Sequence, residues 1–503
     1  MDKLGNLINI RFNSCIMRIR VNRMPNRFYP DSTRTILRFM DYGHDRSKGI
    51  IRKVMEMDQS ETEAVLNDVL SKFAIRHRNI TKILEKHYKR IVSEVSELAN
   101  ELKKVPVNKK LLIGSYFTNE YSIESAAFFN PSIIEAPEQY GLVEGRKKVI
   151  LSFRAIGEGH ISSIVFRSGV IDKNGTFEVA PYGDRIEEAS MVKQHKYNKE
   201  HFGQKLKALH VSENLGKLIL KELSDGFIYS DLEHVVRRIT EENQLTMEKK
   251  LELEEVIWLA DSYHDIHFSL DTDISERVIF PVSETESNGI EDVRFVKFKS
   301  ENGHFIYYGT YTAYDGHSIL PKLIETHDFY NFKIRPIHGN GALNKNMALF
   351  PRKVNGQYAM LSRIDGFNNY VSFSDNLTVW ENPVKIQEPH YPWEFAQIGN
   401  CGSPLETDKG WLVITHGVGP MRTYCLGASL FDLNDPTKEL ARIKEPLLVP
   451  SQDEMEGYVP NVVYSCGSLI CEDTLILPYG MSDYASSIVT IPLEELLDKI
   501  MES

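Results

Sequence analysis

The segment SNGIEDVRFVKF, residues 287–298, sets two adjacent carboxylates beside basic side chains in an apolar run. A carboxyl group held near a substrate can donate or accept a proton. In an extended segment neighbouring side chains face opposite sides, so we do not expect Glu291 and Asp292 to line one pocket as a pair. One of them is a candidate catalytic acid, and Arg294 is expected on the same face as Asp292. A charge cluster on an edge strand is the alternative interpretation.

Motifs for other chemistries are not found in the sequence. No GxSxG, HExxH, Walker or dinucleotide-binding motif occurs in a suitable setting, and the 16 histidines show no metal-ligand spacing. The five cysteines lack CxxC spacing, which indicates free thiols in a reducing cytoplasm rather than a disulfide framework or a zinc site. We therefore expect neither a metal nor an organic cofactor.

Two stretches of the sequence have the apolar periodicity of helices. The first runs from about residue 45 to 105, where DQSETEAVLNDVLSKFA is expected to begin with a capping box of Ser60 and Glu63. The second, from about 195 to 268, interrupts a region of short runs that are typical of strands. The sequence therefore predicts an N-terminal helical module at 1–110 and a helical insertion at about 195–268.

From Leu111 onward the sequence changes to short runs rich in Ile, Val, Phe and Tyr, separated by Gly, Asn, Asp and Pro. Such runs are typical of antiparallel strands, and they continue from 277 to 496 without alternating helices. A sandwich, a barrel and a propeller all fit this pattern. Repeated strand–turn units that contain Ser168-Gly169 and Ser374-Asp375 favour a propeller.

Six motifs follow one another between residues 128 and 483. They are FFNPSII (128–134) with VILSFRA (149–155), GIEDVRF (289–295), KNMALFP (345–351), IGNCGSPLETDKGWLVITHGV (398–418), GASLFDLNDP (427–436) and LPYGMSD (477–483). In type and order they resemble glycoside hydrolase family 130, the mannoside phosphorylases and related mannosidases. Six ordered motifs are far more specific than any one of them. The resemblance implies a mainly β fold, with a five-bladed β-propeller catalytic domain that spans 111–503 and bears the helical insertion.

The resemblance also assigns roles to the matched positions. Asp292 matches the general acid, which in this family acts through a hydroxyl of the bound mannose. The positions associated with phosphate are Arg154, Lys345, Asn346, Arg363 and His416. The positions associated with the substrate are Asn130, Glu291, Arg294 and Asp483, of which the last grips the mannosyl unit. The implied reaction is a reversible, inverting phosphorolysis of a β-mannoside, which releases mannose 1-phosphate and a shortened sugar acceptor.

An inverting reaction needs a carboxylic acid at the leaving oxygen and a nucleophile on the opposite face of the sugar. Water as the nucleophile requires a second carboxylate, whereas a phosphate dianion requires cations and hydrogen-bond donors. The basic side chains at the matched positions favour inorganic phosphate as a co-substrate. An inverting β-mannosidase, with Glu284, Glu286 or Glu291 activating water, is the first alternative, and a non-catalytic sugar-binding propeller is the second.

Three positions depart from the family pattern. Val293 stands where the family has Pro or Ala, Gln397 where phosphorylases often have a basic residue, and Lys345 where an Arg is expected. The loss of one cation and of one fork-shaped donor weakens the argument for phosphate without removing it.

The formal net charge of −11 gives no broad attraction to nucleic acid or to an anionic membrane, so we expect neither as a partner. The arginine-rich segment 11–38 is expected to be a solvated or domain-docking face. No secretory signal and no run of about 18 apolar residues are apparent. We therefore expect a cytoplasmic enzyme whose partners are a β-mannoside oligosaccharide and phosphate, with exposed helices that offer an interface for a homo-oligomer.

Overall fold

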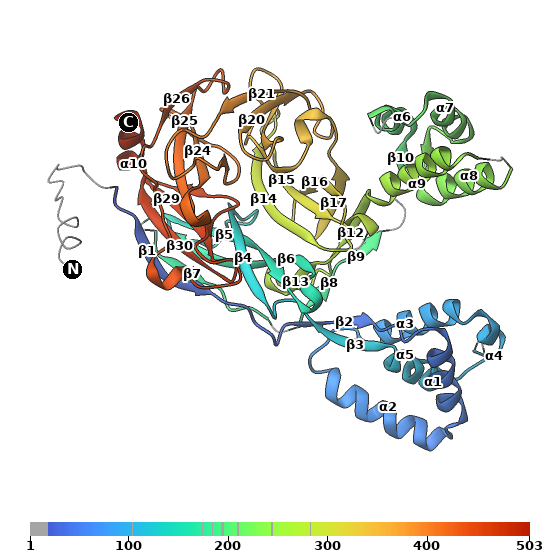
Figure 1. Cartoon of the computed structure of the whole chain (residues 1–503). Helices are drawn as coiled ribbons and strands as arrows, with labels where there is room; N and C mark the ends of the chain where they lie inside the picture. Colours follow the sequence, from blue (N-terminus) through green and yellow to red (C-terminus); the bar gives the residue numbers. More distant parts are fainter. Residues whose placement is uncertain are drawn as a thin grey trace, which may run out of the picture.

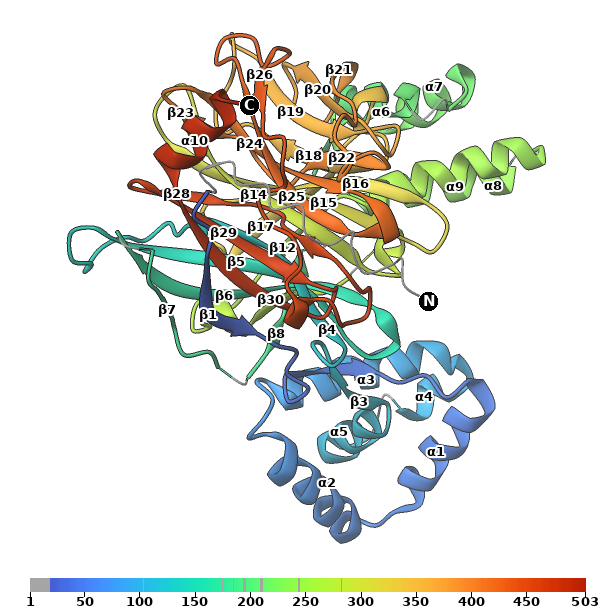
Figure 2. The ribbon, with the colours of Figure 1, turned by 60° about the vertical axis from the view of Figure 1, so that its left-hand side comes forward.

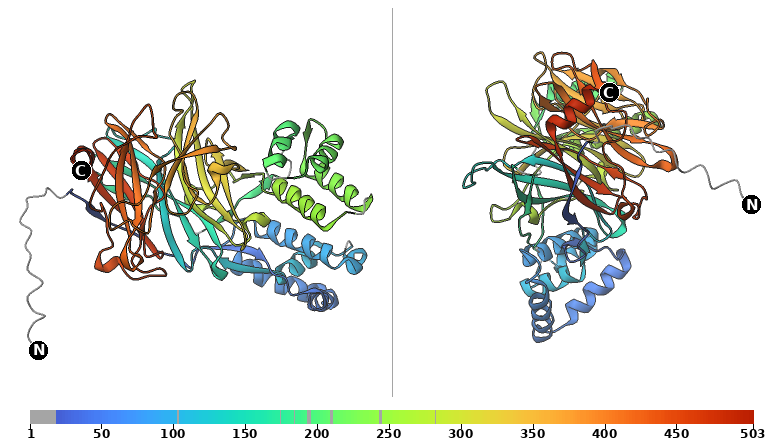
Figure 3. Two further views of the ribbon diagram at one scale, coloured as in Figure 1. Left: turned by 45° about the horizontal axis from the view of Figure 1, so that its top comes forward. Right: turned by 90° about the vertical axis from the view of Figure 1, so that its left-hand side faces the viewer.

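The structure is a computed structural model that describes residues 19–102, 104–173, 175–183, 185–192, 196–208, 211–242, 245–281 and 283–503. A β-rich body forms most of the chain, and two groups of helices extend from it (Figures 1 and 3). The fold is mainly β, as the sequence predicted. Among the helices of the described residues, none combines the length and the apolar character needed to cross a lipid bilayer.

Five of the sheets in the described chain contain four or more strands each. The first contains β4 (Ala127–Glu135), β5 (Arg146–Ile156), β6 (Ser162–Asp172), β13 (Arg277–Ile279) and β8 (Glu187–Glu188), with β7 (Phe177–Val179) beside β6. The second contains β14 (Ile290–Lys299), β15 (Phe305–Tyr314), β16 (Ile319–Thr326), β17 (Asn331–Pro336), β12 (His264–His267) and β9 (Ser190–Val192). The third contains β18 (Lys345–Leu349), β19 (Tyr358–Arg363), β20 (Asn369–Ser374) and β21 (Glu381–Gln387).

The remaining two large sheets lie toward the end of the chain. The fourth contains β22 (Gln397–Asn400), β24 (Gly410–Val418), β25 (Tyr424–Phe431) and β26 (Glu439–Arg442), with β23 (Leu405–Thr407) beside β24. The fifth contains β27 (Val463–Tyr464), β29 (Thr474–Met481), β30 (Ala485–Pro492) and β1 (Asn22–Phe28), with β28 (Leu469–Cys471) beside β29. The helix α10 (Leu493–Met501) follows β30 directly.

Apolar clusters fill the space between successive sheets, and the same holds for the fifth and the first. From the first pair to the last, members on the two sides are Phe166 and Phe295, Val296 and Met347, Leu361 and Val413, Leu412 and Leu475, and Ile476 and Leu151. Each sheet therefore packs on two others. This double burial explains why a strand such as β24 is buried along its whole length.

The fifth sheet includes a strand from the N-terminal part of the chain (Figure 2). β1 pairs antiparallel with β30, and Arg23 donates to both carboxylate oxygens of Glu454 at 3.0 and 2.9 Å. Residues 22–28 therefore belong to the β-rich body, which corrects the assignment of all of 1–110 to a helical module. The other predicted domain boundaries stay predictions.

The N-terminal group of helices consists of α1 (His44–Glu56), α2 (Gln59–Phe73), α3 (Ile80–Glu94), α4 (Ala99–Leu102) and α5 (Val107–Tyr116), next to the paired strands β2 (Thr35–Phe39) and β3 (Thr118–Ser122). α3 and α5 meet closely at Gly114, where a Cβ would lie 2.0 Å from the carbonyl oxygen of Leu84. The change from helix to strand predicted at Leu111 thus occurs later, because α5 continues to Tyr116.

The first residue of α2 differs from the sequence-based expectation. Asp58 is the N-cap, and its side chain accepts a hydrogen bond from the backbone N–H of Glu61. The predicted capping box of Ser60 and Glu63 is therefore wrong by two residues. Asp is as favourable an N-cap as Ser, and here it stands earlier in the chain.

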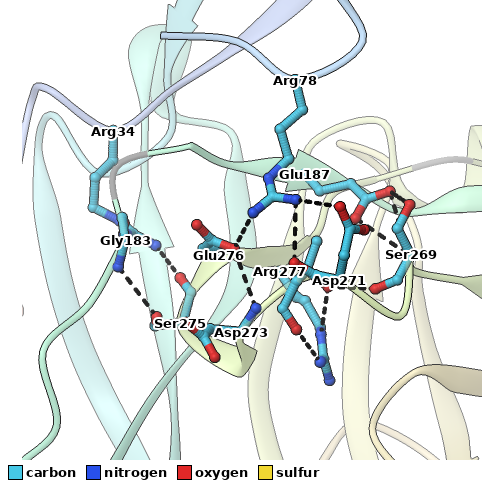
Figure 4. A network of polar contacts seen from close by, with 11 residues as sticks. Arg34, Arg78, Gly183, Glu187, Ser269, Asp271, Asp273, Ser275, Glu276 and Arg277 are labelled. Atoms are coloured by element: carbon cyan, nitrogen blue, oxygen red, sulfur yellow. Dashed lines mark hydrogen bonds and ion pairs between the residues drawn. The ribbon is translucent and has the colours of Figure 1, made fainter. Parts of the chain in front are cut away.

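Arginines join the N-terminal helices and the segment before them to the β-rich body (Figure 4). Arg78, in the loop between α2 and α3, donates to Asp271 at 3.0 Å and to Glu276 at 2.8 Å. Arg34 is almost fully buried and donates to the carbonyl oxygen of Ser275. These contacts connect parts of the chain that are far apart in sequence.

The second group of helices lies between two strands of the second sheet. It contains α6 (Lys199–Ala208), α7 (Glu213–Glu222), α8 (Tyr229–Glu242) and α9 (Met247–Asp261), with the short pair β10 (Tyr197–Asn198) and β11 (Gly226–Phe227). These helices share an apolar cluster of their own, which includes Leu215, Leu232 and Val256. They therefore form a compact unit inserted between β9 and β12.

Candidate active site

Three candidate site residues occupy the same kind of irregular position on three different sheets. Asn130 on β4, Asp292 on β14 and Asn346 on β18 have φ angles of 50°, 55° and 69°. At each of them the strand register shifts, between Phe129 and Ser132, between Glu291 and Arg294, and between Lys345 and Ala348. Asn and Asp tolerate the left-handed backbone better than other non-glycine residues, and such bulges re-aim a side chain. Each of the three strands therefore interrupts its pleat where a polar side chain enters the site.

The bulge at Asp292 overturns one expectation from the sequence. Arg154 on β5 donates to Glu291 at 2.8 Å and lies 3.6 Å from a carboxylate oxygen of Asp292. The two neighbouring carboxylates therefore meet the same cation, and the prediction that they face opposite sides is wrong. Strict alternation holds only for a regular strand, and the left-handed φ of Asp292 breaks it.

Asp292 accepts hydrogen bonds both at its carboxylate and at its backbone carbonyl. The amide of Asn130 donates to one carboxylate oxygen at 2.7 Å, and Arg294 donates to the backbone carbonyl of Asp292 at 3.0 Å. Burial raises the pKa of Asp292, but the charges of Arg154 and Arg294 and the hydrogen bond from Asn130 together leave it below its ordinary value. Asp292 is therefore ionised in this arrangement.

Glu291 bridges two of the cations that the sequence assigned to phosphate. Its carboxylate oxygens lie 2.8 Å from Arg154 and 2.6 Å from Lys345. One carboxylate thus holds cations from two different sheets. An incoming anion at Arg154 and Lys345 must share them with Glu291.

His416 on β24 lies beside Arg363 on β19. Arg363 and the amide of Gln397 both donate to Nε2 of His416, at 3.2 and 3.0 Å, so the imidazole carries its proton on Nδ1. Burial, together with the charges of Arg363 and Arg294, lowers the pKa of His416 well below its ordinary value. His416 is therefore neutral and adds no positive charge to the site, although it was expected among the basic side chains that bind phosphate. Arg294 supplies a further cation beside it.

Sequence reasoning missed Tyr464 on β27, which connects several site residues. Its hydroxyl accepts from Arg294 at 2.8 Å and from Asn346 at 3.1 Å. Asn400 also escaped notice, although its side chain and that of Asn346 donate to each other's backbone carbonyls at 2.7 and 2.9 Å. Nothing near Tyr464 in the sequence marks it, because its strand has only two residues.

Asp483 lies in the turn between β29 and β30, with a φ of 51°. Burial and the neighbouring charge of Asp292 raise the pKa of Asp483 to about 6, and the charge of Arg154 opposes this rise. Asp483 therefore belongs to the same electrostatic neighbourhood as Asp292. Protonation changes its charge close to neutral pH.

All ten sequence-assigned residues belong to one connected neighbourhood built from the five large sheets. Several buried nitrogens in it lack a hydrogen-bond partner among the described residues, namely Nε of Arg154, Arg294 and Arg363. Four cationic side chains, Arg154, Arg294, Lys345 and Arg363, stand against the three carboxylates of Glu291, Asp292 and Asp483, so the site has an excess of positive charge. Such an arrangement suits an anionic ligand.

The other acids considered for the activation of water are placed differently. Glu286 is buried and accepts hydrogen bonds from Lys322 at 2.8 Å and from Tyr311 at 2.7 Å. The side chain of Glu284 lies outside the described residues. Within the described chain, no group of three or more His, Cys, Asp or Glu side chains is arranged to hold a metal ion.

The family model and the relatives that match this chain are all described as mannoside phosphorylases. The model of the family described as beta-1,4-mannooligosaccharide phosphorylase matches residues 230–502 of this chain. The 1,2-beta-oligomannan phosphorylase of Thermoanaerobacter sp. (strain X514) is 36% identical over 221 residues, which are 42% of this chain and 72% of the relative. The Beta-1,2-mannobiose phosphorylase of Listeria innocua serovar 6a is 30% identical over 255 residues, which are 48% of this chain and 68% of the relative.

Solved structures were also matched, at lower identity. The structure of Beta-1,2-mannobiose phosphorylase from Listeria innocua in complex with beta-1,2-mannobiose gives a TM-score of 0.46 at 22% identity. That alignment covers 76% of this chain and 94% of the other.

Proposed function

Because this chain belongs to glycoside hydrolase family 130, the family of the beta-1,4-mannooligosaccharide phosphorylase model, we propose that it is a glycoside phosphorylase that cleaves β-mannosides with inorganic phosphate. The products are mannose 1-phosphate and a shortened sugar acceptor, and the reaction inverts the anomeric carbon. The observation that carries this proposal is the surplus of cations around Asp292, together with the match of the chain to named mannoside phosphorylases.

Asp292 acts as the general acid and passes its proton toward the leaving oxygen through a hydroxyl of the bound mannose. A general acid must hold a proton, and Arg154 and Arg294 lower the pKa of Asp292 in the ligand-free site. A phosphate dianion beside Arg154 and Lys345 offsets their charge and raises the pKa of Asp292 again. Binding of the co-substrate therefore prepares the acid for the reaction.

Arg154, Lys345 and Arg363 bind the phosphate by charge. The neutral His416 accepts a hydrogen bond from Arg363 and orients it, and Asn346 donates to the carbonyl of Asn400 and to the hydroxyl of Tyr464 beside them. A bound phosphate takes up donors of Arg154 and Lys345 that Glu291 now holds. Asn130, Arg294 and Asp483 position the sugar and the acid on the other side. No cofactor beyond phosphate is required by this chemistry.

An inverting mannosidase is less well supported. It needs a free carboxylate to activate water, opposite the acid. Glu291 is ion-paired with Arg154 and Lys345, and Glu286 is bonded to Lys322 and Tyr311, so neither carboxylate is free to bind the attacking water. A non-catalytic sugar-binding protein would not require a carboxylate such as Asp292 surrounded by cations.

The five large sheets are proposed to be the blades of a five-bladed β-propeller. The support is the cyclic order of the apolar clusters, in which each sheet shares one with the next and the fifth shares one with the first. The candidate site then lies on the central axis, where the first strands of the sheets converge. A cytoplasmic location is proposed as well, because Cys401, Cys425, Cys466 and Cys471 are buried free thiols.

A panel of β-mannosides incubated with and without phosphate tests the function. We expect mannose 1-phosphate only when phosphate is present, and at least a thousandfold loss of turnover in Asp292→Asn, because the amide cannot donate the proton as an acid. Release of free mannose at an undiminished rate without phosphate would identify a hydrolase instead. A fully active Asp292→Asn variant would remove Asp292 from the mechanism.

A further inference from the structure

A hollow lies next to the turn that carries Asp483. Its cavity volume is about 610 Å³, and its lining includes Arg27, Tyr29, Asp453, Glu456, Tyr458 and Tyr484. Ligand pockets usually have volumes of about 300–1,000 Å³, so this hollow has room for a ligand of its own. Arg27 and Tyr29 come from β1 and the residues just after it, whereas the other residues come from the last part of the chain.

Three tyrosine rings stand exposed around this hollow. Tyr29, Tyr458 and Tyr484 are 57%, 70% and 43% exposed, so none of them is a core residue. The rings of Tyr29 and Tyr484 lie 6.4 Å apart, and the ring of Tyr458 lies 6.0 Å from that of His160. Exposed aromatic faces in a concavity are suited to packing against the C–H faces of a ligand that also carries hydroxyl groups.

The charges of the hollow favour an uncharged ligand. Arg27 lies 3.5 Å from the buried carboxylate of Glu454, which it shares with Arg23. Asp453 and Glu456 are exposed and form no ion pair with another described residue. Two free carboxylates repel an anion such as phosphate, whereas they accept hydrogen bonds from hydroxyl groups.

The hollow and the active site share structural elements. Tyr484 follows Asp483 directly, and its backbone carbonyl accepts a hydrogen bond from Phe128 at 2.8 Å, two residues before Asn130. His160, which faces Tyr458, lies in the loop after β5, near the end of the strand that carries Arg154. The hollow therefore lies close to the turn that carries Asp483 and to the strand that carries Asn130.

We infer that this hollow is a remote saccharide subsite, which binds a mannosyl unit beyond the two sugars at the bond that is cleaved. The inference rests on the proposed function for the identity of the sugar. The tyrosine rings pack against the sugar faces, and Asp453 and Glu456 accept hydrogen bonds from its hydroxyl groups. The subsite thus selects oligosaccharides over disaccharides.

Tyr458→Ala tests this inference through the dependence of the rate on chain length. In phosphorolysis of a β-mannotetraose, kcat/KM should fall about tenfold, because one aromatic contact with the distal sugar is lost. For the β-mannobiose of the same linkage, kcat/KM should stay within about twofold of the wild-type value. Tyr458→Phe, which retains the ring, should restore the preference for the tetraose.

Tyr140→Ala is the matched control. Tyr140 is 81% exposed in the loop between β4 and β5, at the opposite end of β5 from Arg154. This variant should leave both substrates unaffected. Equal losses on both substrates in Tyr458→Ala, or no loss on the tetraose, would overturn the inference.

Direct binding separates this inference from the proposed reaction. If the wild-type protein forms no mannose 1-phosphate from any mannoside, the proposed function fails, and calorimetry with the tetraose then decides about the hollow. Weaker binding by Tyr458→Ala than by Tyr140→Ala would support the subsite. Equal binding by the two variants, or no binding by the wild-type protein, would contradict it.

Discussion

Glu291 is the side chain on which the balance of charge in the site depends most. It holds Arg154 and Lys345 at 2.8 and 2.6 Å and stands next to Asp292 in the chain. Its negative charge keeps two cations in place and also limits how far they lower the pKa of the neighbouring acid. A phosphate ion that binds there shares these cations with Glu291, so the cations need not move far.

Asp483 should produce an acidic limb in the activity profile. Its pKa is raised to about 6, so the carboxyl group is protonated below that pH and can no longer accept a second hydroxyl of the mannosyl unit. We expect KM for the mannoside to rise several-fold as the pH falls from about 7 to about 5. Steady-state kinetics over this range measure the effect.

Asp483→Asn is the control for that profile. Its side chain does not titrate, so KM should be higher at neutral pH and should vary little between about pH 7 and pH 5. An acidic limb of unchanged position in Asp483→Asn would assign the titration to another group.

The sequence named ten candidate residues that the structure brings together, but it did not predict how their side chains are oriented. GIEDVRF identified Asp292 through its resemblance to a family motif, and that family assignment is confirmed. The pairing of Glu291 and Asp292 on one cation depends on a left-handed φ at position 292, which Asp permits but does not require. The neutral state of His416 likewise depends on its burial beside Arg363, which no local pattern reveals.

Among the structural elements, β1 shows where local patterns lose their predictive power. Its sequence NRMPNRF contains a proline and two adjacent pairs of polar residues, and it is a strand only because β30 offers it an edge. The apolar strands of the body were recognisable from sequence because both of their faces are buried. An edge strand such as β1, whose partner lies at the other end of the chain, does not have this apolar sequence pattern.

The attachment of β1 should depend on Glu454. This carboxylate is fully buried and accepts hydrogen bonds from Arg23 and Tyr479. Glu454→Gln leaves Arg23 and Arg27 without their counter-charge, and we expect it to lower the free energy of unfolding by about 2 kcal/mol. Thermal or urea unfolding measures the difference, and Glu445→Gln, at an exposed position, should show almost none.

Acid should remove the same stabilisation in the wild-type protein. Burial raises the pKa of Glu454, but hydrogen bonds from Arg23 and the backbone of Ser451 lower it to about 2. The stabilisation is therefore complete above the unfolded-state pKa of about 4.3 and is lost as the pH falls from there toward 2. The difference in stability between the wild-type protein and Glu454→Gln should shrink in that window. A difference that is constant from pH 6 to pH 3 would contradict this account.

At the scale of the whole molecule, helices are attached to a body whose sheets pack cyclically (Figure 1). The N-terminal helices meet that body through Arg78, which joins the loop before α3 to Asp271 and Glu276. None of these three residues contacts the residues around Asp292 in the interactions described above. The helices are therefore expected to influence stability and assembly more than the chemical step.

Arg78→Ala should loosen this attachment without impairing catalysis. Two ion pairs are lost, one of them with the largely buried Glu276, and we expect a destabilisation of about 1 kcal/mol. Hydrogen exchange should become faster in segments 75–80 and 269–277, while kcat stays unchanged. Arg76→Ala, which loses only a partly exposed pair with Glu120 beside it, is the control. Equal exchange in both variants would argue against Arg78 as the attachment point.

The pairing of Asn22 with Thr490 has a consequence for biosynthesis. During translation β1 leaves the ribosome long before β30 exists, so it must wait for almost the entire chain before it finds its partner. The last sheet is then completed after the other four, and a prematurely terminated product retains an unpaired edge that invites aggregation.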